Sequence, residues 1–112
     1  MVAIPKNLEF ASADSVLIID HDAIVANWRW LDTKSCPETK TAAVVKADGY
    51  GLGATDFVPD LASAGCRTFF VMSLAEAVSV RTALSAAGHQ EVDIFTLGGC
   101  HLGQESDFID YR

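Results

Sequence analysis

Apolar residues alternate along the chain between two kinds of pattern. Four short runs are rich in β-branched and other apolar residues, as is typical of strands buried in a parallel sheet, and they lie at residues 15–19, 42–45, 67–72 and 92–97. Between these runs, apolar residues recur at intervals of three and four, which predicts amphipathic helices at residues 20–34, 57–64 and 74–88. Residues 101–111 fit the start of a further helix. This alternation predicts an α/β fold with parallel strands and right-handed crossovers.

Local signals mark several of the expected helix ends. Asp20 stands where an N-cap residue favours a helix start, and Ser73 with Glu76 forms a capping box. Gly65 is typical of the residue that follows a helix C-terminus. Pro59 is accommodated only in a first turn, so we expect the helix around it to start late or to begin irregularly.

Composition narrows the classes of protein that the chain can represent. Its 112 residues amount to one domain at most, and 50% of them are hydrophobic, which is enough for a core. The formal net charge of −7, without any basic run, argues against nucleic acid or an anionic membrane surface as a partner. No apolar stretch approaches the ~20 residues of a membrane span, and residues 1–10 do not form a signal peptide, so we expect a cytoplasmic protein.

The residues that most often bind metals are scattered. Three cysteines, Cys36, Cys66 and Cys100, show no C-x-x-C spacing, so we expect small buried or half-buried thiols in a reducing cytoplasm. The three histidines form no i, i+4 pair, which favours exposed or capping roles. We therefore expect no metal site.

The stretch with the clearest chemical potential is residues 41–53, T-A-A-V-V-K-A-D-G-Y-G-L-G. Lys46 stands where the apolar strand should end, and a turn with three glycines follows it. The neighbouring residues Val45 and Ala47 have apolar side chains, which favours desolvation of its amine. A desolvated, neutral amine can condense with a carbonyl group. A solvated lysine beside an ordinary turn is the alternative that these residues alone leave open.

This stretch resembles the cofactor-lysine motif of bacterial alanine racemases, which usually reads V-V-K-A-N-A-Y-G-H-G. The chain differs from that motif at three positions, with Asp48 for Asn, Gly49 for Ala and Leu52 for His. The run D-H-D-A-I-V-A-N at residues 20–27 is similar to the family's opening pattern, a strand followed by D-x-x-A-x-x-x-N. The family consists of pyridoxal 5′-phosphate (PLP) enzymes built on a TIM barrel.

The resemblance implies a fold, a reaction and a set of partners. Because a TIM barrel has eight strand–helix pairs, residues 15–112 would form its first half, after a lead-in at residues 1–14, in an apparently truncated chain. The family interconverts L-alanine and D-alanine through a PLP aldimine by two-base proton transfer, for cell-wall peptidoglycan supply. The full-length parent is expected to be a homodimer.

The resemblance also assigns roles to individual residues. Lys46 would be the catalytic and cofactor-binding lysine, Tyr50 would contact the cofactor phosphate region, and Leu97 would pack against the pyridine ring. The opposing tyrosine base and most cofactor anchors would lie beyond residue 112. For Asp48, a supporting role beside Lys46 and a solvated turn position both stay open.

Two alternatives remain at this level. The chain could belong to another TIM-barrel PLP protein, such as a broad-specificity amino-acid racemase or a PLP carrier. It could also be a non-catalytic half-barrel whose open sheet edges pair with another copy.

Overall fold

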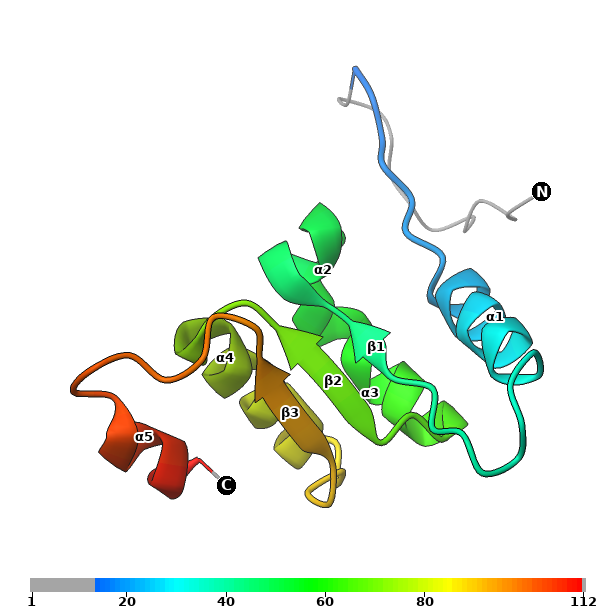
Figure 1. Cartoon of the computed structure of the whole chain (residues 1–112). Helices are drawn as coiled ribbons and strands as arrows, with labels where there is room; N and C mark the ends of the chain where they lie inside the picture. The colour runs from blue at the N-terminus through cyan, green and yellow to red at the C-terminus, as the bar shows by residue number, and fades with distance from the viewer. Residues whose placement is uncertain (1–13, 112) are drawn as a thin grey trace.

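The computed structural model describes residues 14–111, which contain a three-stranded sheet and five helical segments (Figure 1). The elements in chain order are α1 (His21–Asp32), β1 (Ala43–Val44), α2 (Lys46–Gly51), α3 (Ala54–Ala64), β2 (Thr68–Val71), α4 (Leu74–Ala86), β3 (Asp93–Thr96) and α5 (Glu105–Asp110). The strands are parallel and follow the order β1-β2-β3, so the predicted α/β fold is confirmed.

Side chains along each strand alternate between the two faces of the sheet, and the register places paired residues on the same face. Val44 pairs with Phe70, which in turn pairs with Phe95, and this row lies on one face. Phe69 and Val71 lie on the other face and are fully buried, because α3 and α4 cover it (Figure 1). The core therefore lies between the sheet and these two helices.

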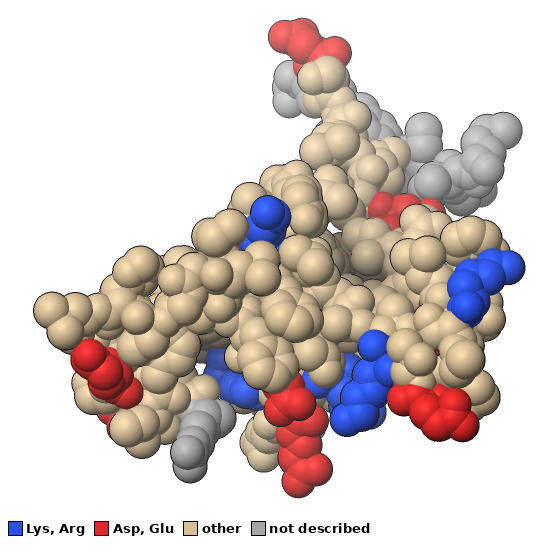
Figure 2. Space-filling model, in the orientation of Figure 1, with Lys and Arg blue, Asp and Glu red and all other residues tan. Residues whose placement is uncertain are grey.

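The opposite face of the sheet is open in the described residues. Val44 is 46% exposed and Phe95 is 50% exposed, and the rings of Phe70 and Phe95 stack with centroids 5.3 Å apart. Figure 2, in the same orientation, shows mostly uncharged residues over the strands and charged residues mainly toward the periphery. An apolar face of this kind is typical of a sheet that packs against further structure.

The predicted strand at residues 15–19 is wrong, because the described structure has no strand there. The segment runs away from the sheet before α1 (Figure 1), and Leu17 is 77% exposed. A β-branched run becomes a strand only when its backbone groups pair with a neighbouring strand, and the sheet of residues 14–111 ends at β1 on that side.

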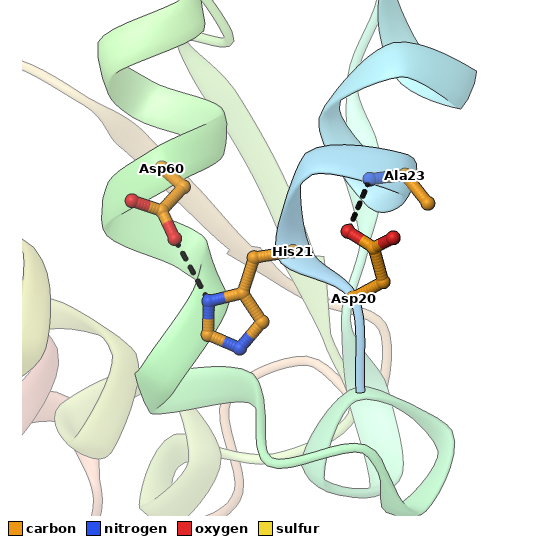
Figure 3. Close-up of polar contacts among 4 residues, drawn as sticks. All are labelled: Asp20, His21, Ala23 and Asp60. Carbon is orange, nitrogen blue, oxygen red and sulfur yellow. Dashed lines mark hydrogen bonds and ion pairs between the residues drawn. The ribbon is translucent and has the colours of Figure 1, made fainter. Parts of the chain in front are cut away.

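Helix α1 begins as its acidic residues predict. The Ala23 amide donates to Asp20 Oδ1 at 3.0 Å, which confirms Asp20 as the N-cap (Figure 3). His21 Nδ1 lies 2.9 Å from Asp60 Oδ2, so a side-chain contact joins α1 to α3 (Figure 3). Trp28 packs against the core and its indole Nε1 donates to the Thr41 carbonyl at 3.1 Å.

Helix α3 corrects the expectation for Pro59. The helix begins at Ala54, so Pro59 lies in its interior and not in its first turn. One missing N–H is tolerated because α3 is held by packing: its buried residues are Ala54, Phe57, Val58, Leu61 and Ala62.

The remaining expectations concern the C-terminal helix, the cysteines, the lead-in and membrane spans. The helix expected within residues 101–111 forms as α5. Cys66 is buried as predicted, whereas Cys36 and Cys100 are exposed, because each lies in a loop outside the core. Residues 1–13 of the predicted lead-in lie outside the described residues. No helix within residues 14–111 has the length and apolar character needed to cross a bilayer.

Candidate functional site

Lys46 lies two residues after the end of β1, at the carboxyl end of the sheet. The Val45 amide still donates to the Phe70 carbonyl at 2.8 Å, so sheet pairing reaches the residue before the lysine. The Lys46 side chain is half-buried, and it forms no ion pair with any residue in the range 14–111. The amine is therefore available at the edge where parallel α/β folds bind their ligands.

Segment α2 after Lys46 is a left-handed turn and not an ordinary helix. Ala47, Asp48, Gly49 and Tyr50 all have φ between 51° and 63° and ψ between 35° and 48°. This conformation costs about 1–2 kcal/mol for each residue that carries a Cβ. Three of the four residues pay that cost, so the turn persists only because contacts around it are strong enough to hold it.

Asp48 supplies one of those contacts. Its Oδ1 accepts a hydrogen bond from the Ala54 amide at 2.9 Å, and its carbonyl accepts from the Gly53 amide at 3.0 Å. A carboxylate at this place also interacts favourably with the positive, N-terminal end of the α3 dipole. Asp48 is exposed and joins the turn to α3, and within residues 14–111 no hydrogen bond or ion pair links its side chain to Lys46, so both of its possible roles stay predictions.

Gly49 lets the turn pack closely on α3. It is buried, and a Cβ placed on it would lie 2.5 Å from Cζ and 2.6 Å from Cε1 of Phe57. The Phe57 ring therefore fills the space that a methyl group at position 49 would need. Glycine at position 49, where the motif has alanine, is thus explained by the close packing of Phe57.

Glu76 is the residue that sequence reasoning missed. Its Oε1 accepts from the Ala47 amide at 2.9 Å, and its Oε2 accepts from the Met72 amide at 2.6 Å. The capping box is confirmed only in part: Ser73 Oγ accepts from the Glu76 amide at 3.4 Å, but the Glu76 carboxylate binds Met72 and Ala47. The signal in the sequence was a helix-start motif, which gives no hint of a partner 29 residues earlier.

Tyr50 and Leu97 lie at the same edge of the sheet as Lys46. Tyr50 is in the left-handed turn and is 63% exposed, and it also lines an apolar groove beside α1 and β1. Leu97 directly follows β3, is 52% exposed, and its amide donates to the Val71 carbonyl at 2.8 Å. Since neighbouring strands are ~4.8 Å apart, the ends of β1 and β3 are about 10 Å apart. Within residues 14–111 no hydrogen bond joins these three side chains.

Fold and site together define a class of protein: a parallel β/α domain with a lysine at a strand's carboxyl end that has no ion-pair partner among residues 14–111, followed by a glycine-rich turn held by hydrogen bonds. Comparison with known proteins agrees with this class. The model of the alanine racemase N-terminal domain family matches residues 19–112. The chain therefore belongs to the alanine racemase N-terminal domain family, as its motif suggested.

Individual relatives support the same assignment. The alanine racemase of Acidiphilium cryptum is 49% identical over 89 residues, which is 80% of this chain and 23% of that protein. The alanine racemase of Cereibacter sphaeroides is 48% identical over 88 residues, or 72% of this chain and 25% of the relative.

A crystal structure of alanine racemase from Bartonella henselae with covalently bound pyridoxal phosphate superposes with a TM-score of 0.72 at 43% identity, covering 82% of this chain and 25% of that one. The chain thus spans about a quarter of the length of these relatives. The predicted fold class, a partial racemase barrel domain, is confirmed.

Proposed function

We propose that this chain is the cofactor-lysine portion of an alanine racemase that interconverts L-alanine and D-alanine. The observation that carries the proposal is the position of Lys46, half-buried and without an ion pair in residues 14–111, at the carboxyl end of β1. The relatives named alanine racemase support the choice of alanine as substrate.

The side chains at this edge fit PLP by their chemistry. A primary amine at Lys46 suits its aldehyde, the hydroxyl of exposed Tyr50 can donate to its phosphate, and apolar Leu97 can lie against its ring. When bound, PLP supplies an electron sink for the charge left at Cα after a proton is removed. The relative from Bartonella henselae has pyridoxal phosphate bound covalently, which supports the same cofactor here.

In this proposal the residues of the chain act by holding and moving one proton. The Lys46 amine binds the cofactor and then serves as the acid–base group on one face of the alanine Cα. The left-handed turn, held by hydrogen bonds to Glu76 and Asp48, keeps that amine at the strand end. The acid–base group for the opposite face would come from the remainder of the enzyme, which we propose to be a homodimer.

A chimera tests the proposal. Residues 19–112 would replace the matching segment of the Bartonella henselae enzyme, and the rates for alanine, serine and lysine would be compared. We expect the chimera to racemise alanine fastest and Lys46→Ala to lower the rate by about 10²–10⁴-fold or more. Lys40→Ala, a change of an exposed lysine in the loop before β1, is the matched control and should leave the rate unchanged.

The same experiment decides the neighbouring enzyme class. Faster turnover of serine or lysine than of alanine would replace the proposal by a broad-specificity racemase, and PLP binding without any turnover would indicate a carrier protein. A chimera that folds, binds PLP and keeps full activity after Lys46→Ala would contradict the role of Lys46.

The open sheet face favours a second candidate function, assembly with another protein chain. Val44, Phe70 and Phe95 present an apolar row that helices do not cover in residues 14–111. Sedimentation velocity of the purified chain tests this candidate directly. A concentration-dependent dimer would support assembly through the sheet, and a clean monomer with cooperative unfolding would count against it.

A further inference from the structure

We propose that Glu76 is a positioning residue for Lys46: its carboxylate holds the left-handed turn and thereby fixes where the lysine amine lies. The inference rests on the proposed function in one respect, namely that Lys46 is the amine that binds the cofactor. The geometry itself comes from the described contacts of Glu76 with Ala47 and Met72.

Glu76 joins the ends of two neighbouring strands. The Ala47 amide, one residue after Lys46, donates to Oε1 at 2.9 Å. The Met72 amide, one residue after β2, donates to Oε2 at 2.6 Å. Both amides lie beyond the last pairs of the sheet, where the ladder no longer satisfies them. One side chain from α4 therefore satisfies an amide in the turn after β1 and an amide directly after β2.

The contact needs a carboxylate and not merely a polar side chain. Two N–H groups point at two oxygens, and each oxygen can accept one of them. Glutamine has a single oxygen, so Glu76→Gln would set an NH₂ group against one of the two donors. Hydrogen bonds to an ionised acceptor are also shorter and stronger than neutral ones.

The link to Lys46 follows from the backbone conformation. Ala47 is the first of the residues with positive φ, so the amide held by Glu76 is the point at which the left-handed turn begins. If this amide is released, the strained residues can relax, and the direction of the neighbouring Lys46 side chain is no longer fixed. On the other side of the turn, Asp48 holds the Ala54 amide, so the segment is anchored at both ends.

The test compares the wild-type chain with Glu76→Gln and with the matched control Glu91→Gln. Glu91 is exposed in the loop before β3 and its change removes the same charge. Amide hydrogen exchange by NMR reports on the turn, and thermal unfolding confirms that each variant is folded. Competitive labelling with acetic anhydride compares Lys46 with exposed Lys40, and labelling with PLP followed by borohydride compares the same two amines.

The expected result is specific to the turn. Loss of a charge-assisted hydrogen bond should raise exchange at the Ala47 amide by about 10–100-fold in Glu76→Gln. Acetylation of half-buried Lys46 should rise toward that of Lys40, and the preference of PLP for Lys46 should be lost. Glu91→Gln should match the wild type in all three readouts.

Each other result has a defined meaning. Unchanged exchange at Ala47, or faster exchange without any change in Lys46 acetylation, would overturn the positioning role. A wild-type chain in which PLP shows no preference for Lys46 would contradict the proposed function, while the acetylation and exchange changes in Glu76→Gln would still support the positioning role. The two failures are thus distinguishable.

Discussion

Substitution of Gly49 by alanine should destabilise the chain more than the same substitution at Gly51. Both glycines have positive φ, +63° at Gly49 and +84° at Gly51, so both variants incur the cost of a left-handed alanine. That shared cost is about 1–2 kcal/mol. Only at Gly49 does the new methyl group meet a neighbour, because Phe57 atoms lie 2.5 Å and 2.6 Å from the Cβ position.

The difference between the two variants isolates the clash. Overpacking in a closely packed site costs about 1–3 kcal/mol, so Gly49→Ala should lower the free energy of unfolding by about 2–5 kcal/mol in total. At Gly51 no atom lies within 4 Å of the Cβ position, so Gly51→Ala should show the conformational cost alone. Urea unfolding followed by circular dichroism measures both variants on the same chain.

A double-mutant cycle with Phe57→Leu extends the test. A shorter side chain at position 57 vacates the space beside Gly49, so the double variant should be more stable than the sum of the single changes predicts, by about 1–3 kcal/mol. Equal destabilisation by Gly49→Ala and Gly51→Ala, with no coupling to Phe57, would refute the reasoning. It would mean that the Phe57 ring moves aside without cost.

Three further predictions concern the same molecule. Asp48→Ala should cost about 1 kcal/mol by removing the acceptor for the Ala54 amide, whereas Asp48→Asn should cost less because it keeps an oxygen there; urea unfolding of both variants decides this. Burial raises the pKa of the Cys66 thiol above its usual value of 9.0, so its stabilising contribution is present below pH 9 and falls as the pH rises further. The stability of the wild-type chain should therefore decline more steeply than that of Cys66→Ala above pH 9, and parallel curves would contradict this. The 112-residue chain alone should racemise alanine negligibly, since it offers an acid–base candidate for one face of Cα only and each such group contributes about 10²–10⁴-fold; polarimetry on the purified chain measures the rate.

The sequence predicted those features that depend on local patterns. Asp20 marks the start of α1 because an N-cap acts on amides within its own turn. The alternation of apolar runs and helical spacing was sufficient for the parallel sheet and for the helices that cover it. Lys46 was correctly placed at the end of β1 because the apolar run stops there.

The features that failed depend on distant partners. Residues 15–19 have the composition of a strand, yet a strand requires pairing, and in the described residues this segment pairs with no strand and the sheet ends at β1. Pro59 has a poor propensity for a helix interior, but burial of Phe57 and Leu61 outweighs it. In both cases tertiary context decided against the local signal.

The left-handed turn was beyond sequence reasoning for a related reason. Ala47 and Tyr50 belong to residue types that rarely adopt positive φ, and contacts such as those of Asp48 with Ala54 and of Glu76 with Ala47 hold them in this conformation. The Glu76 contact spans 29 residues, so no local window contains it. Resemblance to the family motif marked the position of the lysine and not the conformation that holds it.

The most direct test of the account is to locate the amine that binds PLP. The purified chain would be incubated with PLP, reduced with borohydride, digested and analysed by peptide mass. We predict that the label lies on Lys46, and that Lys46→Ala and Lys46→Arg both remove it, since a guanidinium does not condense with the aldehyde in this way. A label that maps instead to Lys34 or Lys40 in the wild-type chain would contradict the account and would leave Lys46 as a strand-end charge beside a structural turn.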